Sequence, residues 1–290
     1  MKFGKVEHPE LIDFTMPLDH PDTERILSRS NLVNDPNFYI GCAKWNRQDL
    51  KNFYPRGTKD ELVYYASQFN SIELNATFYR IFPPDQYQKW YDRTPANFRF
   101  FPKMINRVSH LRRLNDKVYE ITDRYLEVTT LLREKMGTIF LQLHGNFGPK
   151  NWDRVERYVN YWPKEIPLAM EFRHKDWYAD NSIAEDLYYL LKENNIAHVL
   201  VDTAGRRDLM HMRLSNNEAF VRYVGANHPT DYDRLDDWIT RLQQWKSKGL
   251  TNIHFFVHQN LELESPLLSA YLIEKLNRKL DAQLVIPNTL

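Results

Sequence analysis

The chain has 290 residues, of which 42% are hydrophobic and 14% aromatic, so it can build a large core and does not belong to a disordered or low-complexity class. Its 39 basic and 38 acidic residues nearly cancel, which gives no support to nucleic acid as a partner, although a local basic cleft stays open. The single cysteine excludes an internal disulfide and a cysteine-based zinc site, and the sequence has no glycine-rich nucleotide-binding loop. It shows no signal-peptide core and no apolar run near the ~20 residues of a membrane span, so we expect a cytoplasmic protein.

Residues 1–37 are polar and rich in proline, and we expect them to form an extension that packs on the main domain. Eight strand-like runs follow, with helical patterns between most of them. They span residues 38–45, 71–79, 97–104, 138–144, 167–174, 196–203, 218–225 and 252–260. Eight strands alternating with helices predict a single (β/α)8 TIM barrel over residues 38–290, with a doubly wound open sheet as the alternative.

Helix starts are visible between the strand runs. Residues 58–61 and 182–185 read as capping boxes ahead of helical apolar spacing, and Ser265-Pro266 is a favourable start for the last helix. The weakest helical pattern lies between the sixth and seventh strands, near residues 207–215.

Charged residues fall on the inward face of the predicted barrel. Strand side chains alternate between a face that packs on the helices and a face that fills the interior. A barrel filled for stability alone would carry valine, isoleucine and leucine there, because buried ions cost several kcal/mol unless they are paired. Most of these charges lie in the carboxyl halves of their strands, at the end where barrel enzymes bind substrates. The charged residues predicted to point inward are Glu73, Lys103, Glu171, Arg173, Asp202 and Arg222.

Each candidate allows a functional and a structural interpretation. Glu171 and Arg173 could be an acid/base group and its orienting partner, or a salt bridge. Lys103 could hold an anion, or be solvated at the end of its strand. The alternative for the whole set is an ion-pair network that fills the barrel.

Aromatic and histidine residues near the strand ends are ambiguous in the same way. Trp45 and Trp177, just after the first and fifth strands, could stack on a sugar or base, or pack at the rim. His254 and His258 could bind a metal, but hydrogen-bonded interior histidines are the commoner case. Cys42 fits a small buried apolar residue.

These residues carry a family resemblance. The chain resembles the YecE-like family, domain-of-unknown-function family 72, over roughly residues 38–275, and the resemblance implies a TIM-barrel fold without implying a reaction. It departs from the usual family pattern at His144-Gly145, at Val224 and at residues 257–260. The matching segments are Gly41 with Trp45, 53–55, 69–79, Trp90, 94–95, 98–103, His110, 141–143, 171–174 with Trp177, and 221–222.

The sequence therefore predicts an enzyme that performs acid/base chemistry on a small anionic, phosphorylated or carboxylated, sugar-like substrate, without a metal or cofactor. The alternatives are a metal-dependent phosphodiesterase or nuclease, using His144, Glu171, Asp202, His254 or His258 as ligands, and a non-catalytic ligand-binding barrel. The predicted catalytic residues are Glu73, Glu171 and Asp202. The predicted substrate-binding residues are Trp45, Asn75, Lys103, Gln142, Arg173, Trp177, Arg222 and Asn260.

Overall fold

The computed structural model describes residues 4–28 and 35–289, so residues 1–3 and 29–34 of the predicted extension lie outside the described part. All eight predicted runs contain a strand, and the sixth contains two short ones. The second run is shorter than expected, because residues 75–78 form a 3-10 turn. The strands are β1 (Asn37–Cys42), β2 (Ser71–Leu74), β3 (Arg99–Pro102), β4 (Ile139–Gln142), β5 (Leu168–Glu171), β6 (Ala197–His198), β7 (Leu200–Thr203), β8 (Glu218–Gly225) and β9 (Asn252–Gln259).

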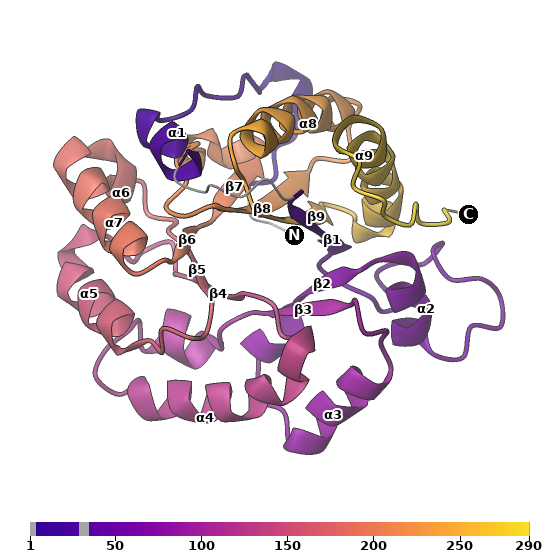
Figure 1. The fold of residues 1–290 in the computed structure, drawn as a ribbon, viewed down its shortest axis with the longest axis horizontal. Coiled ribbons are helices and arrows are strands. Elements are labelled where there is room, and N and C mark those ends of the chain that lie inside the picture. Colours follow the sequence, from indigo (N-terminus) through magenta and orange to yellow (C-terminus); the bar gives the residue numbers. More distant parts are fainter. Residues whose placement is uncertain (1–3, 29–34, 290) are drawn as a thin grey trace.

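The strands are parallel and form three hydrogen-bonded sheets around a common centre (Figure 1). The sheet orders are β1-β9-β8-β7, β2-β3 and β4-β5-β6. An α/β fold of parallel strands and outer helices is thus confirmed. The ladders do not close into one continuous eight-stranded barrel.

Side chains replace the backbone ladder between β1 and β2. The Asn70 amide accepts a hydrogen bond from the Ile40 N–H (3.0 Å) and donates one to the Phe38 carbonyl (2.6 Å). The Tyr65 hydroxyl donates to the Ser71 carbonyl (3.0 Å) and accepts from the Cys42 N–H (2.8 Å). The buried backbone groups at this seam are therefore satisfied without strand pairing.

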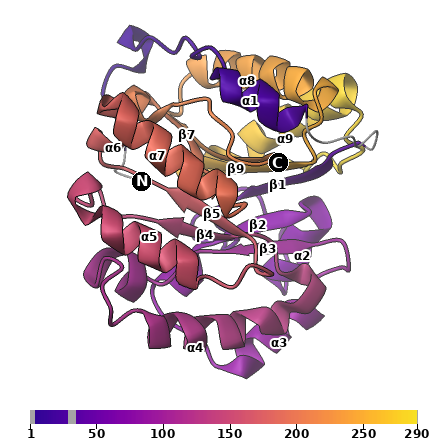
Figure 2. The ribbon, with the colours of Figure 1, turned by 60° about the vertical axis from the view of Figure 1, so that its left-hand side comes forward.

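Helices follow most strands and cover the outside of the sheets (Figures 1 and 2). The helix starts differ by a residue or two from the sequence pattern: Asp60 and Asp180 are the capping residues, where residues 58 and 182 were expected. The helices are α1 (Pro21–Leu27), α2 (Glu61–Gln68), α3 (Pro84–Asp92), α4 (Tyr119–Thr129), α5 (Trp152–Tyr161), α6 (Asp176–Ala179), α7 (Asn181–Glu193), α8 (Thr230–Ser247) and α9 (Ser265–Leu280).

Helix α1 covers the gap where the sequence pattern is weakest. Residues 204–217, all described, form a 3-10 turn at Ala204–Leu209 and no α-helix between β7 and β8. Thr23 of α1 donates to the Met212 carbonyl (3.1 Å) and accepts from the Leu214 N–H (3.1 Å). Asp19, just before α1, accepts from Trp245 of α8 (2.9 Å). The N-terminal segment thus packs beside α8, in the place of a missing helix (Figure 1).

The centre of the fold is an apolar layer beneath the carboxyl ends of the strands. Its members are Phe101, Phe140, Ala169, Ala197, Val199, Val201, Phe220 and Phe256. Two larger apolar clusters lie between the strands and the helices. No helix among the described residues is long and apolar enough to cross a membrane.

The predicted inward position of Asp202 is wrong. Val199 and Val201 belong to the central layer, so Asp202 points outward, where Arg234 (2.6 Å) and Trp238 (2.7 Å) of α8 donate to its carboxylate. Alternation alone could not fix the face of this strand, because either phase places apolar residues on both sides. The two valines pack in the apolar centre, and Arg234 on the helix side neutralises the Asp202 carboxylate.

Candidate functional site

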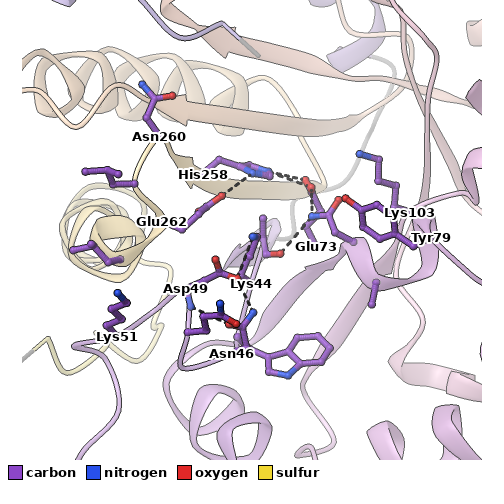
Figure 3. A pocket seen from close by; sticks show the side chains of 17 residues that line it. Lys44, Asn46, Asp49, Lys51, Glu73, Tyr79, Lys103, His258, Asn260 and Glu262 are labelled. Carbon is purple, nitrogen blue, oxygen red and sulfur yellow. Dashed lines mark hydrogen bonds and ion pairs between the residues drawn. The ribbon is translucent and has the colours of Figure 1, made fainter. Parts of the chain in front are cut away.

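A cavity of about 780 Å³ opens at the carboxyl ends of β1, β2, β3 and β9 (Figure 3). The loop after β1 and the loop after β9 form two of its walls, and Glu73, Asn75 and Lys103 come from the ends of β2 and β3. This is the end of a parallel α/β fold at which ligands bind. The polar and aromatic lining residues are Lys44, Trp45, Asn46, Gln48, Asp49, Lys51, Glu73, Asn75, Tyr79, Lys103, His258, Asn260 and Glu262.

Arg222 of β8 is the hub of a buried charge network next to this cavity. Its guanidinium donates two hydrogen bonds to the Glu73 carboxylate, each 2.8 Å long, and a third of 2.6 Å to Glu171. Arg222 is 1% exposed and both carboxylates are fully buried. Arg173 donates to the other Glu171 oxygen. Buried ions need such complete pairing to be tolerated.

The network keeps both carboxyl groups ionised. Burial by itself would raise their pKa values, but the neighbouring cations reverse the effect. Arg222 and His258 hold the pKa of Glu73 well below its usual range. Arg173, Arg222 and Lys103 lower the pKa of Glu171 to about 2.

His258 of β9 lies between two carboxylates, and both belong to the cavity wall. Its Nε2 atom is 3.1 Å from Glu73 Oε1, and its Nδ1 atom is 3.8 Å from Glu262 Oε1. Burial would lower the pKa of His258, but Glu73 and Glu262 together raise it. The two carboxylates thus favour the protonated imidazole, and both lie beside it in Figure 3.

Lys103 is the buried cation of the cavity floor that lacks a carboxylate partner. Its Nζ atom donates to Gln142 Oε1 (2.9 Å), an oxygen that also accepts from Arg222 (3.3 Å). The ammonium lies 4.5 Å from the Phe78 ring centre and 5.5 Å from that of Phe140. Within the described residues no carboxylate oxygen comes within 4.0 Å of it. Burial, and secondly Arg222, lower its pKa to about 7.

The structure brings most of the predicted site residues to one place. Trp45, Glu73, Asn75, Lys103 and Asn260 line the cavity. Gln142, Glu171, Arg173 and Arg222 belong to the network beside it and are not among its lining residues.

The structure does not place Trp177 among the residues that line the cavity. Trp177 is fully buried in α6, donates from its indole N–H to the Phe147 carbonyl (2.6 Å) and packs edge-on against Phe172, 5.0 Å between ring centres. The short helix α6 turns the indole into the core between the strands and the helices, away from the cavity.

Sequence reasoning missed the residues contributed by loops. Asn46 and Glu262 line the cavity and lie beyond the predicted strand runs. Lys44 and Tyr79 also line it; they belong to the predicted runs 38–45 and 71–79, but the strands end earlier, at Cys42 and Leu74. The only available signal was the run of polar residues directly after the first and last strands.

The histidines and carboxylates proposed as metal ligands do not converge. His254 lies in the apolar interior, 4.9 Å from the Phe101 ring centre, and His144 packs edge-on against His110. Asp202 is on the outer face. In the described ranges, the ligand atoms that cluster suitably belong to His20, Asp22 and Glu185, by α1 and α7, where Arg213 already donates to both carboxylates.

Comparison with known proteins places this geometry in a family. The family model described as "Protein of unknown function DUF72" matches residues 39–289. The chain belongs to the DUF72 family. Among curated DUF72 relatives, UPF0759 protein YecE of Escherichia coli K12 is 26% identical over 267 residues, covering 83% of this chain and 93% of YecE. UPF0759 protein YunF of Bacillus subtilis is 27% identical over 200 residues, covering 65% and 70% respectively.

Two solved DUF72 structures share the fold. The protein from Enterococcus faecalis aligns with a TM-score of 0.68 at 19% identity, covering 83% of this chain and 98% of that one. The protein from Thermotoga maritima aligns with a TM-score of 0.66 at 22% identity, covering 83% and 99%. At these identities the likeness concerns the DUF72 fold and not a reaction.

Proposed function

We propose that this protein is an enzyme that performs acid/base chemistry on a small anionic, phosphorylated or carboxylated, sugar-like molecule in the cavity at the carboxyl ends of a TIM barrel. The proposal extends the three observed sheets to a complete barrel. Contacts between neighbouring sheets support that extension. Side-chain hydrogen bonds connect β1 with β2, and isolated β-bridges at Lys103–Phe140 and Phe100–Met136 connect the β3 and β4 segments.

One observation carries the proposal: the charge left over at the cavity floor. Glu73 is matched by Arg222, Glu171 by Arg173, and Glu262 by His258. Lys103 faces the cavity without a carboxylate of its own. A substrate anion placed against Lys103 would supply that partner, and because the Lys103 side chain is buried, the attraction would be stronger than at the protein surface.

The proton chemistry is assigned to His258 and Glu73. His258 is held between Glu73 and Glu262, and all three line the cavity. An imidazolium paired with a carboxylate can donate a proton to a substrate oxygen and recover it. Arg222, Arg173, Glu171 and Gln142 hold these groups in position.

The remaining lining residues suit a hydroxylated substrate. Asn46, Asn75 and Asn260 offer amide donors and acceptors, and Trp45 offers an aromatic face. Sugar-like molecules present hydroxyl groups at their edges and C–H groups on their faces, so they match both kinds of surface.

Matched ligand pairs test the proposal. Gluconate and sorbitol differ in charge but carry similar hydroxylated chains, as do glycerol 3-phosphate and glycerol. We expect an anion at ten times its Kd to stabilise the protein by about 1.4 kcal/mol and to raise Tm by roughly 3 °C, with little effect of its neutral counterpart.

The variants make the test specific. Lys103→Met is expected to lose the response to anions. Lys89→Met removes the same charge at an exposed helix position that pairs with Asp85 (2.8 Å), and is expected to keep the response. Equal shifts for anions and neutral counterparts at matched ionic strength, or an unchanged response in Lys103→Met, would count against the proposal.

A further inference from the structure

Three hydrogen bonds fix the backbone of Lys103 at the end of β3. Two hydroxyl groups, Thr77 Oγ1 (2.8 Å) and Tyr125 OH (2.9 Å), donate to its backbone carbonyl, and its N–H donates to the Leu74 carbonyl (3.3 Å). The amine nitrogen lies near the rings of Phe78 and Phe140, and the residue lines the cavity. A fixed backbone and a restricted side chain hold the amine nitrogen at one place in the cavity.

A second buried lysine shows what a structural ammonium looks like in this protein. Lys135 is 5% exposed, and its Nζ atom donates to the carbonyls of Tyr91 (2.7 Å) and Thr94 (2.6 Å) and to the Thr94 hydroxyl (3.3 Å). Three donors thus meet three acceptors, away from the cavity. Lys103, in contrast, has one protein acceptor in the hydrogen bonds of the described residues, and that acceptor is shared with Arg222.

We propose that the Lys103 amine is a nucleophile that forms an imine with the carbonyl carbon of a small anionic oxo compound, of the 2-oxo acid class, bound in the cavity. This inference rests on the proposed function and names the substrate class for the same site. Burial and the neighbouring Arg222 guanidinium both favour the neutral amine. Burial and a nearby cation are the two conditions that activate a lysine for attack on carbonyl groups.

The step is balanced within the site. The nitrogen lone pair forms a bond to the carbonyl carbon, and the C=O electrons move to oxygen. The C–O bond then breaks, and the oxygen leaves as water with the two protons of the amine. Protonation of the imine, for which His258 and Glu73 are the nearby proton-exchanging groups, yields an iminium ion.

The substrate class follows from the charge at the floor. An iminium nitrogen carries the same positive charge as the ammonium, so the carboxylate next to the reacting carbon keeps a cation beside it. The buried charges of Glu73, Glu171, Arg173 and Arg222 stay matched throughout. A neutral carbonyl compound would lack this compensation.

Reductive trapping tests the inference. The protein is incubated with pyruvate and sodium borohydride near pH 7, digested and analysed by mass spectrometry for the N-(1-carboxyethyl) group that reduction of the imine leaves on lysine. We expect modification of Lys103 to exceed that of Lys135 and of the exposed Lys89 by ~10-fold or more, because Lys103 lines the cavity that holds the substrate, while Lys89 pairs with Asp85 on the surface and the Lys135 amine is held by three acceptors elsewhere.

Lactate separates this inference from the proposed function. It has the charge and nearly the size of pyruvate but no keto group, so it is expected to bind without forming an adduct. Lys103→Arg keeps the positive charge and is expected to retain the thermal shift with lactate while giving no adduct at position 103. Lys103→Met is expected to lose both.

The outcomes are distinct. Selective trapping at Lys103 supports the inference. Absence of an adduct at Lys103, or labelling no greater than that of Lys89, overturns it. If lactate still raises Tm in that case, the proposed anion site stands; if neither lactate nor the larger anions raise Tm, the proposed function falls as well.

Discussion

Replacing Glu171 by glutamine breaks the buried network at its most constrained carboxylate. Glu171 is fully buried between Arg173 and Arg222, and the substitution leaves both guanidinium groups with less compensating charge. A fall of its pKa from 4.5 to about 2 corresponds to roughly 3 kcal/mol of stability at neutral pH. Breaking a buried ion pair typically costs about 3–5 kcal/mol, which agrees with the stability loss expected from the pKa shift.

The pH dependence has a defined sign. The depressed pKa of Glu171 contributes stability that is present above its unfolded value of 4.5 and is lost as the pH falls through about 2. The difference in unfolding free energy between wild type and Glu171→Gln is therefore expected to be roughly 3 kcal/mol above pH ~5 and about half that value near pH ~3.

Urea denaturation at several pH values measures this difference. Asp85→Asn is the control, because it breaks an exposed pair with Lys89 and is expected to change stability by less than about 0.5 kcal/mol. A Glu171→Gln protein that is as stable as wild type at neutral pH would refute the buried-pair account and return Glu171 to the role of a solvated acid/base group.

Two further substitutions probe the charges on either side of the strands. Lys103→Met is expected to stabilise the protein by about 2–4 kcal/mol near pH 7, because it removes a buried amine whose pKa is lowered to about 7. Between pH about 7 and 10.5 the unfolded wild-type chain binds more protons than the folded one, so wild-type stability should rise over that window. Urea denaturation at each pH should show this rise for the wild type and not for the variant. Asp202→Asn, which removes a buried partner of Arg234, is expected to cost about 3–5 kcal/mol in the same assay but to leave the Tm response to anions unchanged; a lost anion response with intact stability would contradict its outward position.

The sequence predicted the strands well because each has a local apolar pattern. It also predicted Glu73, Lys103 and Arg222 as neighbours, since strand alternation and the shared carboxyl end suffice to place them together. Local patterns do not encode the phase of a strand such as 196–203, where both faces are partly apolar. That phase depends on contacts with α8, which lies far along the chain.

Two other features also depend on long-range packing. Trp177 reads as a rim residue from its place after β5, but α6 turns it into the core against Phe172. The N-terminal segment has no local signal that it replaces the helix between β7 and β8; its contacts with Met212 and Trp245 form only in the folded chain. The cavity loops were missed for the same reason.

A crystal structure of the protein with bound glycerol 3-phosphate tests the central claim most directly. The account predicts the phosphate in the cavity at the ends of β1, β2, β3 and β9, within hydrogen-bond distance of Lys103 Nζ, with the Arg222 pairs to Glu73 and Glu171 intact. A phosphate bound only to exposed lysines elsewhere on the surface, with water alone against Lys103, would contradict it.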